Sequence, residues 1–167
     1  IMYFPKFKWP RIKNPKLAFP LTEAGKKKVI DDEKLALQQI EKAFDQNPDD
    51  IAAIIIEPIQ SEGGDNHFRG EFLRELRRIC DEREALLIFD EIQTGFGLTG
   101  KFWAWENFDV KPDLISFGKK AQIGGIATSD RINDVDNVFK ISSRINSTFG
   151  GNLTDMVRAT QYLKIIE

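Results

Sequence analysis

The chain has 167 residues, the length of one ordinary domain, and its 41% hydrophobic and 30% charged residues are typical of a globular protein rather than a disordered or fibrous one. A formal net charge of −2 gives no overall positive field to attract nucleic acid, and no apolar run approaches the roughly 20 residues needed to span a membrane. A single cysteine, Cys80, excludes an internal disulfide framework and suits a reducing compartment. We therefore expect a cytoplasmic protein that binds neither nucleic acid nor membranes.

Residues 1–30 carry four of the seven prolines together with interleaved lysines, which predicts an extended connector. Its aromatic and basic residues are also compatible with a nucleic-acid surface, but the acidic balance of the rest of the chain favours a connector that packs its rings on the domain. Residues 31–46 repeat apolar side chains at helical spacing, so we predict a helix there. Residues 31–167 then form the main domain. The chain opens on Ile1 in a stretch without a clear element and closes within a helical pattern that has no stop signal, so we expect a segment of a longer protein.

Three short apolar runs without alternation predict buried strands at residues 51–56, 86–89 and 114–117. Residues 71–83 carry their apolar side chains on one stripe, which predicts an amphipathic helix with Cys80 in the core. A last helix is predicted over residues 152–167. Continuous apolar strands separated by helices are typical of a parallel sheet covered on both faces, so the fold class is α/β.

Ligands of open α/β sheets bind beyond the carboxyl ends of the strands, and Glu57, Asp90 and Lys119 each stand within two residues of such an end. Taken alone, Asp90 fits a helix cap or a buried ion pair equally well. An ATPase would need the phosphate loop G-x-x-x-x-G-K-[ST], and neither Gly-Lys pair of the chain completes it. His67 stands alone, without the spacing of metal ligands, so we predict a structural role for it and no metal site.

Lys119 and Lys120 follow the third strand, where a lysine pair is usually a solvated surface. A lysine shielded from water at this edge would instead have a lowered pKa and could form a Schiff base with an aldehyde. Asp90, 29 positions earlier on a neighbouring strand, could keep a pyridine nitrogen protonated through a charge-assisted hydrogen bond. This is the arrangement of pyridoxal phosphate enzymes. Strand alternation permits only one of the two lysines to face the cofactor ring and does not choose between them.

Four segments stand out in chain order: residues 57–64 (EPIQSEGG), 86–97 (LLIFDEIQTGFG), 112–119 (PDLISFGK) and 147–152 (STFGGN). Residues 86–97 and 112–119 resemble the signature of class III pyridoxal-phosphate aminotransferases, and all four segments follow the order of that family's motifs. Residues 57–64 (EPIQSEGG) are similar to its preceding active-site loop, and residues 147–152 (STFGGN) to its later phosphate-binding segment. The resemblance implies that residues 31–167 are part of the large domain of a fold-type I enzyme, with a mostly parallel sheet covered by helices.

The resemblance also implies residue roles. Lys119 would bind the aldehyde of pyridoxal 5'-phosphate and later move a proton, and the family pattern chooses it over Lys120. Asp90 would bind the pyridine nitrogen, while Ile92 would pack on a face of the ring. Gln93 would bond the phenolic oxygen and approach the substrate. Thr148 would bind the cofactor phosphate of a partner subunit, so a homodimer with shared active sites is expected.

Glu62 resembles the family's gate, a carboxylate that neutralises an active-site arginine for one substrate and swings away for another; the alternative is an exposed loop acid. Departures from the common pattern, near residues 98, 120–124 and 153–155, are most similar to the branch of the family that acts on lysine. Asn146 would then lie near the substrate. L-lysine and 2-oxoglutarate are the implied substrates. Ornithine or 4-aminobutyrate as the amine, or a non-catalytic interaction domain, are the alternatives.

Overall fold

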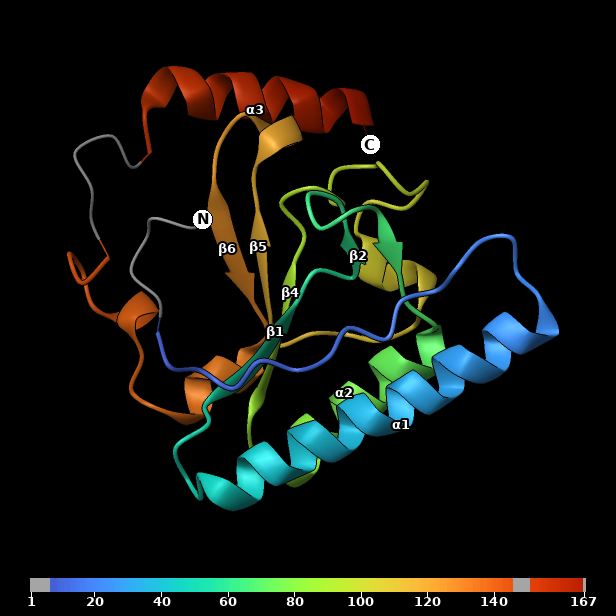
Figure 1. Ribbon diagram of the computed structural model, residues 1–167. Coiled ribbons are helices and arrows are strands. Elements are labelled where there is room, and N and C mark those ends of the chain that lie inside the picture. Colours follow the sequence, from blue (N-terminus) through green and yellow to red (C-terminus); the bar gives the residue numbers. More distant parts are fainter. Residues whose placement is uncertain (1–6, 146–150, 167) are drawn as a thin grey trace. The chain divides into compact units, whose positions relative to one another are not determined.

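The structure is a computed structural model that describes residues 7–145 and 151–166 (Figure 1). The chain forms two compact units, which divide after Ile51. The first unit holds one long helix, and the second holds the sheet and the remaining helices. Within the described residues, no helix is both long and apolar enough to cross a membrane.

Helix α1 spans Glu23–Gln46 and starts eight residues before the predicted start. Thr22 caps it, because its hydroxyl accepts a hydrogen bond from the main-chain N–H of Gly25 at 3.1 Å. The predicted connector of residues 1–30 is therefore wrong over its last eight residues, and extended chain is described only up to residue 22. The extended segment lies along this helix: Lys13 donates to Asp32 at 2.7 Å and its main-chain N–H donates to Gln39 at 2.8 Å.

The main sheet has the strand order β1-β4-β5-β6. Strands β1 (Ala53–Ile56), β4 (Leu86–Asp90) and β5 (Leu114–Phe117) are parallel and confirm the three predicted strands. The fourth strand, β6 (Gly125–Thr128), pairs antiparallel with β5 and was not predicted. The sheet is therefore mostly parallel, and it carries one reversed strand at its edge (Figure 1).

Helix α2 (Gly70–Glu82) confirms the predicted amphipathic helix and packs against β1 and β4. Its apolar stripe is buried, and Cys80 is fully inaccessible, as predicted. Burial raises the pKa of the Cys80 thiol to about 12, because the interior disfavours the thiolate. The thiol is thus a core group.

The last helix, α3 (Leu153–Ile166), also confirms its prediction within the described residues, and it lies against the turn of residues 119–121. A short hairpin of β2 (Ile59–Gln60) and β3 (Asn66–His67) interrupts the path from β1 to α2. His67 pairs with Ile59 in this hairpin, consistent with the structural role predicted for it.

Candidate active site

Strands β4 and β5 bring Asp90 and Lys119 to the same edge of the sheet. Asp90 is the last residue of β4 and lies opposite Ser116 of β5 in the parallel register. Lys119 comes two residues after the end of β5. Because both strands run in the same direction, their carboxyl ends meet at one edge, as expected from the sequence.

Asp90 is tied to the loop that follows it. Its Oδ1 accepts a hydrogen bond from the main-chain N–H of Ile92 at 3.0 Å. Within the described residues Asp90 forms no ion pair, so the alternative of a buried ion pair finds no support there. The carboxylate therefore keeps acceptor capacity at the rim of the sheet.

Lys119 is turned toward the loop after β4 by an unusual backbone conformation. Its φ is +43°, and residues 119–121 form one turn of 3₁₀ helix rather than a continued strand. The ammonium of Lys119 donates to the side-chain oxygen of Gln93 at 2.5 Å, and the ammonium of Lys120 donates to the main-chain oxygen of the same residue. The rule of strand alternation is therefore wrong at this point, because the turn directs both lysines to the same loop.

The two lysines differ in exposure. Lys119 is exposed, whereas Lys120 is half-buried. Burial and the positive charge of Lys119 lower the pKa of Lys120, which the carboxylate of Glu91 partly offsets. The shielding from water that the sequence reasoning expected of the cofactor-binding lysine is therefore found at Lys120 and not at Lys119.

Ile92 lies next to the backbone that leads into the Lys119 turn. A Cβ built on Gly118 would lie 3.7 Å from the Ile92 side chain, so that side chain packs against the backbone just before Lys119. Four of the predicted site residues, Asp90, Ile92, Gln93 and Lys119, are thus gathered where β4 and β5 end.

The hairpin that carries Glu62 lies beside this group. A pocket of about 410 Å³ is lined from the hairpin by Ser61, Asp65 and His67, and from the loop after β4 by Gln93 and Thr94. Glu62 itself is exposed at the tip of the hairpin. This exposure agrees with the alternative of a loop acid as well as with the gate, so the gate stays a prediction. The other two predicted residues, at positions 146 and 148, lie outside the described residues.

Glu91 is a functional support that the sequence reasoning missed. The side chain is fully buried, and its carboxylate accepts hydrogen bonds from the main-chain N–H groups of Ala104 and Trp105, each at 3.0 Å, and from the hydroxyl of Thr94. These bonds close the loop that carries Ile92 and Gln93. The signal was available, because a second acid directly after a buried strand needs an explanation of its own.

Asp113 performs a similar task at the opposite end of β5. The buried carboxylate accepts hydrogen bonds from Arg77 of α2 at 2.7 Å and from the main-chain N–H of Leu87 at 2.8 Å, and Arg131 lies at 3.3 Å. These contacts hold β5 against β4 and α2, and so they stabilise the alignment of the two strands whose other ends carry Asp90 and Lys119.

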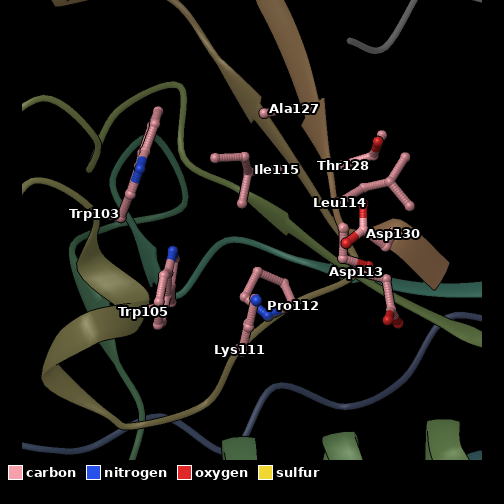
Figure 2. A pocket seen from close by; sticks show the side chains of 11 residues that line it. Trp103, Trp105, Lys111, Pro112, Asp113, Leu114, Ile115, Ala127, Thr128 and Asp130 are labelled. Atoms are coloured by element: carbon pink, nitrogen blue, oxygen red, sulfur yellow. The ribbon is translucent and has the colours of Figure 1, made fainter. Parts of the chain in front are cut away.

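A second pocket, of about 270 Å³, lies near this end (Figure 2). Figure 2 shows Trp103 and Trp105 on one side of it and Pro112, Asp113 and Thr128 on the other. Lys111, Pro112 and Asp113 precede β5, so the pocket opens toward the amino end of that strand. It is distinct from the group around Lys119.

The fold, and the carboxylate and amine at one edge of its sheet, fit the family that the sequence motifs indicated. The chain belongs to the class III aminotransferase family, because the family model described as "Aminotransferase class-III" matches residues 4–167. It is 53% identical over 165 residues to the L-lysine-epsilon aminotransferase of Mycobacterium tuberculosis, covering 98% of this chain and 36% of that protein. It is also 46% identical over 123 residues to the 4-aminobutyrate aminotransferase of Emericella nidulans, covering 72% of this chain and 24% of that protein.

The fold of a solved relative agrees with this assignment. The lysine aminotransferase from M. tuberculosis, in the internal aldimine form, matches with a TM-score of 0.89 and 52% identity over 98% of this chain and 37% of that one. The predicted family and fold are confirmed. The chain spans little more than a third of the length of these lysine aminotransferases.

Proposed function

We propose that the protein containing this chain transfers the terminal amino group of L-lysine to 2-oxoglutarate, with pyridoxal 5'-phosphate as its cofactor. The observation that carries the proposal is the Lys119–Gln93 hydrogen bond at the strand end next to that of Asp90. The high identity to proteins named for lysine supports the choice of amine.

The residues present fit the cofactor by their chemistry. Pyridoxal phosphate offers an aldehyde, a pyridine nitrogen, a phenolic oxygen and a flat ring, and the edge provides Lys119, Asp90, Gln93 and Ile92, respectively. The hydroxyl of Ser116 adds a further donor on the face that carries Asp90, since it is buried and has no hydrogen-bond partner within the described residues. When bound, the cofactor supplies an aldehyde that takes up amino groups and a ring that accepts electrons from the substrate carbon.

The residues of the chain then have distinct tasks. Asp90 would accept a hydrogen bond from the protonated pyridine nitrogen and so favour positive charge at that atom. Gln93 bonds the phenolic oxygen and orients the ring. Lys119 Nζ, held near this site by Gln93, moves a proton at the substrate carbon that bears the transferred amino group. Ile92 excludes water from one face of the ring.

The remaining roles belong to the same proposal. Glu62 gates the substrate site from the hairpin, and the support for this role is that its neighbour Ser61 lines a pocket together with Gln93. Asn146 contacts the substrate, and Thr148 binds the cofactor phosphate of the partner subunit in a homodimer. We also place the protein in the cytoplasm, where its single cysteine stays reduced.

The experiment is an assay of the full-length protein with lysine, ornithine and 4-aminobutyrate, each with 2-oxoglutarate. We expect kcat/KM for lysine to exceed the others at least tenfold. The identity to a 4-aminobutyrate aminotransferase makes that amine the second candidate. Equal or better turnover of ornithine or 4-aminobutyrate would reject lysine, and no cofactor absorbance at all would favour a non-catalytic domain.

A further inference from the structure

The two consecutive lysines hold Gln93 at opposite ends. Lys119 donates to the side-chain oxygen at 2.5 Å, whereas Lys120 donates to the main-chain oxygen. The first contact fixes where the amide points, and the second fixes where the backbone that carries it lies. Such a pair of contacts reaches across 26 and 27 residues of sequence and joins the loop after β4 to the turn after β5.

We propose that Lys120 is a positioning residue of the aminotransferase site, which anchors the main chain of Gln93 so that its side chain stays aligned with the cofactor. This inference rests on the proposed function for its cofactor. Lys120 itself is not a catalytic residue, because it acts through Gln93.

Only one of the two contacts with Gln93 has to break during the reaction. Lys119 must give up its bond to Gln93 whenever its nitrogen engages the cofactor aldehyde or a proton in transfer. The Lys120 contact involves no reacting atom, so it persists at that moment. Gln93 is then free to bond the cofactor through its side chain while its backbone remains fixed.

The surroundings of Lys120 suit an anchor. The side chain is half-buried, unlike that of Lys119. Burial and the charge of Lys119 lower the pKa of the Lys120 amine, and the nearby carboxylate of Glu91 partly offsets this. Glu91 is in turn fixed by the main-chain N–H groups of residues 104 and 105. A charged donor on a partly buried carbonyl is among the stronger protein hydrogen bonds.

Full-length Lys120→Met tests the proposal, since it keeps the length of the side chain and removes the donor. Lys140→Met is the matched control, because Lys140 also donates to a main-chain carbonyl, that of Asn133 at 3.2 Å, and lies outside the site. Amide hydrogen exchange of residues 91–99 is measured without cofactor, and the dissociation constant for pyridoxal phosphate is measured by titration.

We expect Lys120→Met to speed exchange in residues 91–99 on the order of tenfold and to weaken cofactor binding about tenfold. Lys120→Arg keeps a charged donor and should recover most of both losses. In a Gln93→Ala background, Lys120→Met should have little further effect on cofactor binding, because the side chain it positions is gone.

Unchanged exchange in Lys120→Met, or equal effects from Lys140→Met, would overturn the proposal. The proposal would also be overturned if Lys120→Met weakened cofactor binding by the same factor in the Gln93→Ala background as in the wild type. Its effect would then not act through Gln93. Failure of the proposed function gives a different result: if the wild-type protein binds no cofactor, the exchange experiment still reports whether Lys120 holds the loop. If the protein binds the cofactor but prefers an amine other than lysine, amide exchange and cofactor affinity still test the role of Lys120.

Discussion

Lys119 and Gln93 are joined by a hydrogen bond of 2.5 Å between the lysine ammonium and the side-chain oxygen of the glutamine. The bond places the lysine that is expected to hold the cofactor against the residue that is expected to orient it. The turn at Lys119 makes this possible, because a positive φ redirects the chain immediately after the end of β5. Catalysis at this site would therefore depend on one specific lysine of the adjacent pair.

Lys119→Ala should abolish the visible absorbance of bound cofactor in the full-length protein, while Lys120→Ala should retain it. Only Lys119 is expected to bond the cofactor covalently, because the family motif places the cofactor-binding lysine at this position, whereas Lys120 holds a main-chain oxygen. Borohydride reduction of the wild-type protein, followed by peptide mass analysis, checks the assignment. A label found on Lys120 would contradict it.

Asp90→Asn should reduce kcat about 10²- to 10⁴-fold, because a neutral amide does not keep the pyridine nitrogen protonated. The substitution preserves the size of the side chain and an oxygen that can accept from the N–H of Ile92. Cofactor affinity should therefore change much less than kcat. Single-turnover kinetics with lysine separate the two quantities, and a kcat within fivefold of wild type would argue that Asp90 is only structural.

The sequence predicted the parallel strands and α2 closely, because continuous apolar runs and a single apolar stripe each indicate one kind of element. It missed β6, which is a four-residue strand that opens on a glycine and has no apolar run. It also placed the start of α1 too late. The lysines of residues 26–28 hide the apolar stripe there, and the helix is started by the Thr22 cap rather than by hydrophobic periodicity.

Motifs located the candidate site more successfully than they explained its geometry. Asp90, Ile92, Gln93 and Lys119 were chosen together and lie together. The contributions of Glu91 and Lys120 depend on contacts with main-chain groups, and the sequence does not show which main-chain groups these side chains reach.

Glu91→Gln should lower the free energy of unfolding by about 2–4 kcal/mol, because the amide cannot accept all three hydrogen bonds and presents buried donors of its own. Glu106→Gln is the matched control: its exposed carboxylate accepts one main-chain N–H, that of Trp103, at 2.8 Å. We expect a clearly smaller loss there. Urea denaturation of the full-length variants measures both, and equal losses would show that burial of Glu91 does not matter.

Gly125→Ala should destabilise the protein by about 1–3 kcal/mol, since its Cβ would overlap the ring of Phe117 on the neighbouring strand. The adjacent Gly124→Ala is a close control, because there the nearest atom, the main-chain oxygen of Phe117, lies 3.9 Å from the added carbon. Thermal unfolding should separate the two variants by several degrees. Indistinguishable midpoints would mean that the ring moves aside without cost.

The burial of the Cys80 thiol should make the free energy of unfolding depend on pH in the alkaline range. Desolvation raises the pKa of Cys80 to about 12 in the folded protein, whereas a thiol in an unfolded chain has a pKa of about 8.5. Between these values the unfolded state releases a proton that the folded state retains. The free energy of unfolding should therefore fall with rising pH, by at most about 1.4 kcal/mol per unit from this group. Below the lower value both states hold the proton, so this group no longer makes the free energy of unfolding depend on pH.

Cys80→Ala isolates this contribution from the lysines and tyrosines that titrate over the same range. The variant should be less stable than wild type at neutral pH, because it leaves a small cavity in the stripe of α2. The difference between the two proteins should narrow as the pH rises above about 9. A constant difference from pH 7 to pH 11, or rapid reaction of the native thiol with a disulfide reagent at pH 8, would mean that Cys80 is not shielded from water.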